Sequence, residues 1–120
     1  MEKDETVVLD RVTFDDFAGL FDAVELRDVI DRWHADNVQA IEVIAAAHAS
    51  GDSARIGELA HRAAGGAMAI GATALTRACV RLRASAESGK PVTDDEIAPV
   101  REAVAATYSA LRDAFSSSRG

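Results

Sequence analysis

Hydrophobic residues recur at intervals of three and four along most of the chain, which is the spacing of one face of an α-helix. No stretch of any length alternates apolar and polar residues as a half-buried strand does. The helical spacing is unbroken over Ile56, Ala60, Ala63, Ala67 and Ile70. With only two prolines and abundant alanine, the pattern predicts an all-α chain.

Capping residues predict where the first two helices begin. Thr13, with Asp16 three residues later, predicts the start of a short first helix. Asp22 and Glu25 repeat this signal, so a second helix begins there and reaches about Ala49. Phe14, Phe17 and Phe21 lie on one side of the first helix. The candidate core residues of the second helix are Leu26, Val29, Ile30, Trp33, Val38, Ile41 and Ile44.

Glycines and a proline delimit the next two helices. Gly51 and Asp52 separate the second helix from a third, expected at about 53–70 and ended by Gly71. A fourth helix is expected at about 73–88, where Gly89 and Pro91 close it and where Leu75, Cys79 and Leu82 are buried.

A capping box at Thr93 and Glu96 begins the fifth predicted helix, whose apolar stripe reaches about Phe115. Pro99 stands six positions inside it and removes a backbone hydrogen bond. Either a separate turn forms at 94–97, or the helix bends at the proline.

Short connections make consecutive helices antiparallel neighbours. The predicted fold is therefore an all-α, antiparallel up-down four-helix bundle with a short additional N-terminal helix that covers one end. We expect an extended segment at 1–12, a single helical domain at 13–116 and a flexible tail at 117–120.

The composition excludes some classes of function. The chain has 120 residues and a net charge of −7, which argues against a nucleic-acid-binding protein and disfavours an anionic membrane surface. Cys79 is the only cysteine, so no internal disulfide can form. Without a signal peptide or an apolar run long enough to span a bilayer, the expected location is the cytoplasm.

The third predicted helix carries an unusual pair of glycines next to a histidine. Gly65 and Gly66 are adjacent, although each glycine costs a helix roughly 1 kcal/mol relative to alanine. His61 lies off the apolar stripe, four residues before Gly65. The glycines therefore leave room for a large molecule to approach one imidazole.

This region resembles the signature of histidine-containing phosphotransfer (HPt) domains. The resemblance rests on Leu59-Ala60-His61, Gly65, Ile70-Gly71-Ala72 and the following Leu75, Cys79 and Leu82, and covers about residues 24–116. It implies that His61 is the phosphoacceptor of a phosphorelay intermediate, which is not an enzyme. The resemblance also implies partners, namely response-regulator receiver domains and a hybrid histidine kinase.

In such a relay the receiver supplies the aspartyl phosphate, Mg²⁺ and lysine, so the resemblance implies no cofactor or metal in this chain. We expect a monomeric, free-standing carrier. The expected residues for access and partner docking are Glu58, Ala64, Gly65, Gly66 and Met68.

Two residues depart from the family pattern. Ala64 stands where the family usually has lysine, and Arg83 where it more often has Glu or Gln. His61 is ten residues before Gly71, while Arg81 and Arg83 are ten and twelve after it, so all three lie at a similar height in antiparallel helices. Arg83, Arg81 or Arg62 could supply the missing charge, and we favour Arg83.

Other chemistry-bearing residues have simpler interpretations. His34 and His48 are expected on the surface of the second helix, too far apart to chelate one ion, and Cys79 in the core. Two alternatives stay open: a degenerate HPt-like module that binds receivers without being phosphorylated, and a structural or dimerising helical bundle.

Overall fold

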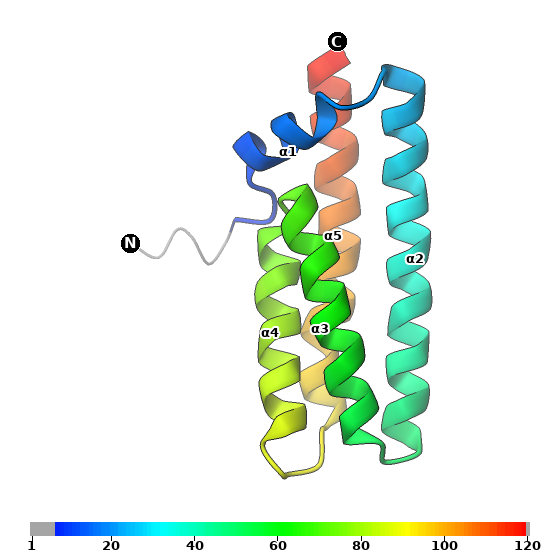
Figure 1. Ribbon diagram of the computed structural model, residues 1–120, viewed down its shortest axis with the longest axis vertical. Helices are drawn as coiled ribbons and strands as arrows, with labels where there is room; N and C mark the ends of the chain where they lie inside the picture. The colour runs from blue at the N-terminus through cyan, green and yellow to red at the C-terminus, as the bar shows by residue number, and fades with distance from the viewer. Residues whose placement is uncertain (1–6, 120) are drawn as a thin grey trace.

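A computed structural model describes residues 7–119 of the chain. This part of the chain is all-helical and contains no strand. The elements, in order, are α1 (Arg11–Ala18), α2 (Ala23–Ala49), α3 (Ser53–Ile70), α4 (Thr73–Glu87) and α5 (Asp94–Arg119) (Figure 1).

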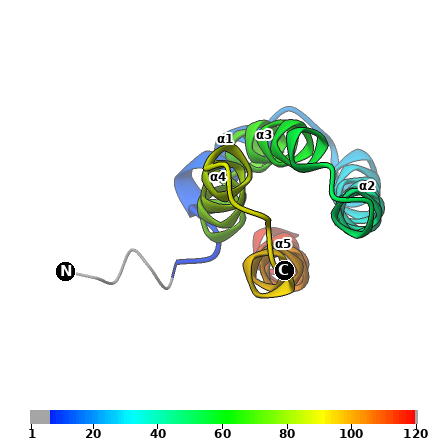
Figure 2. The same cartoon turned by 90° about the horizontal axis from the view of Figure 1, so that it is seen from below.

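The four longer helices run alternately up and down and form one bundle (Figure 1). Seen end-on, α3 lies between α2 and α4, and α5 closes the bundle on the opposite side (Figure 2). The short helix α1 lies across one end of this bundle (Figure 1). The predicted four-helix bundle with an additional N-terminal helix is therefore confirmed.

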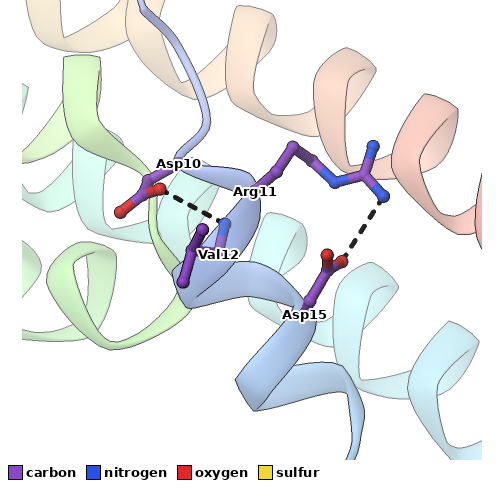
Figure 3. Close-up of polar contacts among 4 residues, drawn as sticks. All are labelled: Asp10, Arg11, Val12 and Asp15. Carbon is purple, nitrogen blue, oxygen red and sulfur yellow. Dashed lines mark hydrogen bonds and ion pairs between the residues drawn. The ribbon is translucent and has the colours of Figure 1, made fainter.

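The start of α1 differs from the prediction. Asp10, not Thr13, caps the helix, because its carboxylate accepts a hydrogen bond of 3.3 Å from the Val12 N–H (Figure 3). The Thr13 hydroxyl donates to the same carboxylate at 2.7 Å. Arg11 and Val12 are thus helical rather than part of an extended segment, and residues 1–6 lie outside the described range.

The predicted boundaries of the middle helices are confirmed. Asp22 and Glu25 form a complete capping box on α2, with bonds of 2.8 Å and 2.9 Å. Asp52 caps α3, and Gly71 ends it in the left-handed conformation, with φ +86°.

The helix α5 is longer than predicted, and of the two alternatives at Pro99 the separate turn at 94–97 does not form. It passes through Pro99 as one helix and continues to Arg119, beyond the expected end near Phe115. The N–H that Pro99 lacks would have bonded to the carbonyl of Asp95, which lies in the exposed first turn, where water can replace it. At that turn the Thr93 N–H donates to Glu96 at 2.8 Å, and this bond lowers the pKa of the Glu96 carboxyl.

Most predicted core positions are buried, with exceptions on α2. Val38 is 41% exposed, so its predicted place in the core is wrong. Asn37, not Val38, continues the helical stripe of Ile30 and Ile41. Over residues 7–119, no helix has the length and apolar character needed to cross a bilayer.

The turn between α3 and α4 fixes α1 on the bundle. The Asp10 N–H donates to the Gly71 carbonyl at 2.8 Å, and Phe14 of α1 is fully buried. A Cβ added to Gly71 would lie 2.8 Å from the Asp10 carbonyl oxygen. Gly71 is therefore required twice, for its backbone conformation and for this close approach.

Gly71→Ala should lower the free energy of unfolding by about 3 kcal/mol, because left-handed alanine is strained by about 1–2 kcal/mol and its methyl group clashes with Asp10. The matched control is Gly51→Ala, which has φ +74° but open space around an added Cβ. It should lose only the strain of left-handed alanine, about 1–2 kcal/mol. Urea unfolding of both variants measures the difference, and equal losses would contradict the close-approach argument.

Candidate functional site

His61 lies half-way along α3 with its side chain exposed. Ala60 before it is fully buried, and so is most of Ala64 one turn later. The inner face of the helix is thus packed into the bundle while the imidazole stands on the outer face. This arrangement gives a partner direct access to the ring from a rigid helix.

Arg83 of α4 contacts the His61 ring. Its Nη1 atom lies 2.6 Å from His61 Nδ1, and its Nε donates to Glu87 Oε2 at 3.0 Å. The predicted position of Arg83 at the height of His61 is confirmed. Sequence reasoning missed Glu87, although its spacing of four from Arg83 is the spacing at which helical side chains pair.

The other two candidate arginines lie on different faces. Arg81 borders a surface hollow between α4 and α5, together with Pro99 and Glu102. Arg62 borders a hollow between α2 and α3. Of the three arginines considered, the structure brings only Arg83 to the imidazole.

Gly65 and Gly66 leave unoccupied space on the surface next to His61. Both are exposed, and a Cβ added to either would meet no heavy atom within 4 Å. Close packing between helices therefore does not explain either glycine. Met68, one turn further along α3, is 61% exposed.

Two of the expected docking residues behave differently from the rest. Ala64 is only 7% exposed, so its predicted place in the surface next to His61 is wrong. It lies one turn after Ala60 on the buried stripe, where a small side chain lets α3 pack closely. Glu58 is exposed, and its carboxylate lies 3.6 Å from Arg55.

Two hollows flank the outer face of α3. One, of about 420 Å³, lies between α2 and α3, and supplies the groove residues of α2 that the sequence did not identify: Trp33, Asp36, Asn37, Gln39, Ala40 and Val43. The other is bordered by Met68, Gly71, Thr76 and Val80. Val80 is 54% exposed, so an apolar strip extends from α3 onto α4.

The remaining histidines are half-buried at the contact between α2 and α5, not free on the surface as predicted. The His34 ring stacks on Tyr108 with 3.8 Å between ring centroids, and Tyr108 donates to Asp31 at 2.7 Å. His48 Nε2 lies 3.0 Å from an Asp94 carboxylate oxygen. Aromatic and acidic partners on α5 explain both placements.

Cys79 is fully buried, and burial raises the pKa of its thiol to about 11. It is therefore protonated near neutral pH and offers no nucleophile. Among the residues that the structure describes, no group of three or more His, Cys, Asp or Glu side chains could hold a metal ion.

Comparison with known families agrees with this geometry. Residues 25–114, three quarters of the chain, match the family described as Hpt domain. No curated protein and no solved structure matches the chain. Hpt domains carry phosphoryl groups without being catalysts, and they typically interact with receiver domains and histidine kinases. The chain therefore belongs to the Hpt domain family, the phosphotransfer modules of two-component signalling.

Proposed function

We propose that this protein is a phosphorelay intermediate that accepts a phosphoryl group on His61 from a receiver aspartate and passes it to a second receiver. The observation that supports this most is the exposed imidazole at 2.6 Å from the Arg83 guanidinium, with open ground at Gly65. An accessible imidazole, a neighbouring cation and an unobstructed approach are what a visiting acyl phosphate requires.

Phosphoryl transfer to His61 requires few chemical groups from the helical bundle itself. A neutral imidazole nitrogen can attack phosphorus, and the loose transition state of phosphoryl transfer needs mainly positioning and charge neutralisation. The receiver brings the aspartyl phosphate, Mg²⁺ and lysine. This chain contributes the nucleophile, a docking face and one cation.

Arg83 is our candidate for the charge that the family usually places as lysine at the position of Ala64. Ala64 is buried, so a charged group there would have to reach past the packed face of α3. The planar guanidinium of Arg83 approaches the ring from α4 instead, and can donate two hydrogen bonds to a phosphoryl group.

The docking face that we propose is centred on Gly65, Gly66 and Met68 and extends over the hollow between α2 and α3. Trp33 and Val43 line that hollow, and the surrounding rim is polar. A small apolar surface next to a reactive group suits a transient protein partner. The partners would be response-regulator receivers and a hybrid histidine kinase, met by a monomeric carrier in the cytoplasm.

A second candidate is a receiver-binding module that is never phosphorylated. The alanine at position 64 favours it, because the lysine that the family usually carries there is missing next to His61. The two functions share a docking face and differ in whether His61 carries a phosphoryl group.

His61→Gln should abolish acid-labile labelling by a phosphorylated receiver, because the amide side chain offers no nucleophilic ring nitrogen. The matched control is His48→Gln, which removes another histidine far along the bundle and should label like the wild type. The measurement is transfer of ³²P from the receiver, with acid treatment of the product. Wild-type labelling in His61→Gln would contradict the assignment, and an unlabelled wild type that still binds the receiver would favour the second candidate.

Arg83→Ala should shorten the lifetime of the phosphorylated protein by about tenfold, which corresponds to about 1.4 kcal/mol of lost charge pairing. The measurement is the decay of label after removal of the receiver. Arg81→Ala, on the face towards α5, is the control and should leave the lifetime unchanged. Equal lifetimes in the wild type and Arg83→Ala would remove Arg83 from the phosphoryl site.

Gly65→Leu should slow transfer from a receiver by about tenfold or more, because a branched side chain fills the approach to His61 and disturbs the contact surface. Phosphorylation by phosphoramidate, a donor too small to need docking, should change little. Gly65→Ala should raise the free energy of unfolding by about 0.5–1 kcal/mol, as alanine does in open helical sites. An equal loss with both donors would show damage to His61 itself rather than to docking.

A further inference from the structure

The contact between Arg83 and His61 determines which ring nitrogen carries the proton. A guanidinium has five N–H donors and no acceptor, and it keeps its proton at any pH a protein meets. At 2.6 Å from Arg83 Nη1, the Nδ1 atom of His61 must therefore accept the hydrogen bond. A neutral ring has one N–H, so its proton lies on Nε2.

Neither nitrogen of the ring can attack phosphorus in this state. The lone pair of Nδ1 is directed at Arg83. Nε2 carries the proton, and its remaining electron pair is delocalised in the aromatic ring, so it is not available for attack. Nε2 is the nitrogen that no other side chain contacts among the interactions of the described residues. It is the open atom of the ring, but its tautomer is wrong for attack.

Glu87 holds the guanidinium in place. Its Oε2 accepts from Arg83 Nε at 3.0 Å, while Nη1 of the same planar group reaches His61. The side chains of Arg83 and Glu87 are 43% and 61% exposed, so the ion pair is hydrated and can open. Glu87 is thus a positioning residue that acts on the imidazole through Arg83.

Resting on the proposed function, we propose that Arg83, positioned by Glu87, acts as a latch on His61. Arg83 keeps the unphosphorylated ring in the non-nucleophilic Nε2–H tautomer until a docked phosphoryl group draws the guanidinium away. The anionic oxygens of the phosphoryl group compete with Nδ1 for the same donors. Release of Arg83 lets Nδ1 take a proton from water while Nε2 gives one up.

The transfer then balances without any further reactant. Nε2 donates its electron pair to phosphorus, and the bond between phosphorus and the aspartyl oxygen breaks. The aspartate leaves as a carboxylate with the electron pair of that bond. Nδ1 keeps the proton it has taken up, and Arg83 donates to the phosphoryl oxygens.

The direct test is the protonation of the ring nitrogens in the neutral ring, read by two-bond ¹H–¹⁵N correlation spectra at mildly alkaline pH. His61→Gln assigns the signals by their loss. Wild type and Arg83→Lys, both with donors only, should show an unprotonated Nδ1 and a protonated Nε2. In Arg83→Glu the carboxylate can only accept, so Nδ1 should be protonated and Nε2 unprotonated. Glu87→Gln weakens the hold on Arg83, so its signals should move from those of the wild type towards those of Arg83→Ala.

A protonated Nδ1 in the wild type, or the same tautomer in wild type and Arg83→Glu, would overturn the latch. Because no phosphodonor is present in this experiment, its result does not depend on phosphotransfer. A ring whose tautomer follows residue 83 but which is never labelled by a receiver would contradict the proposed relay function, not the control of the tautomer.

The kinetic test compares Arg83→Gln with Arg83→Lys, using phosphoramidate as the donor. Glutamine can accept from a protonated Nδ1, whereas lysine can only donate to it. Arg83→Gln should be phosphorylated about tenfold faster than Arg83→Lys, a difference of about 1.4 kcal/mol in activation free energy, and equal rates would overturn the latch. The opposite order would show that the positive charge helps the reaction more than the latch restrains it, and would overturn the proposal.

Discussion

The antiparallel pairing of α3 and α4 around Gly71 is the constraint on which the site depends. It brings together His61 and Arg83, which are 22 residues apart in the sequence. The left-handed turn at Gly71 sets the register, and small residues let the two helices approach closely, as at Gly57, where an added Cβ would lie 3.6 Å from that of Ala86. A wider separation of the helices would leave the guanidinium short of the ring.

The same close packing accounts for the departure at Ala64. A small residue on the inner stripe keeps α3 against its neighbours, and the cation that contacts the imidazole lies on α4 instead. This substitution changes more than the position of the charge. An arginine above Nδ1 can only donate, so it dictates the tautomer of the ring as well as the local charge.

The sequence was sufficient for the fold and for part of the site. Capping residues and glycines located α2, α3 and α4, because those signals are local, and the ten-residue and twelve-residue spacings from Gly71 predicted that Arg83 would lie near His61. Local signals could not decide between Asp10 and Thr13 as the cap of α1, since the choice depends on the contact of Asp10 with Gly71. The burial of Ala64 and the pairing of His34 with Tyr108 depend on the rotation of whole helices, which spacing within one helix does not fix.

The proposed latch would protect the exposed imidazole from phosphorylation by donors other than a docked receiver. A ring on an open surface meets small phosphodonors as well as receivers, and the open ground at Gly65 does not discriminate between them. Occupation of Nδ1 by Arg83 would discriminate between them. A docked receiver holds its phosphoryl group at the guanidinium long enough to displace it, whereas a small donor in free collision would displace it only rarely and react slowly. Selectivity then comes from the residence time of the partner, which the docking face on α2 and α3 determines.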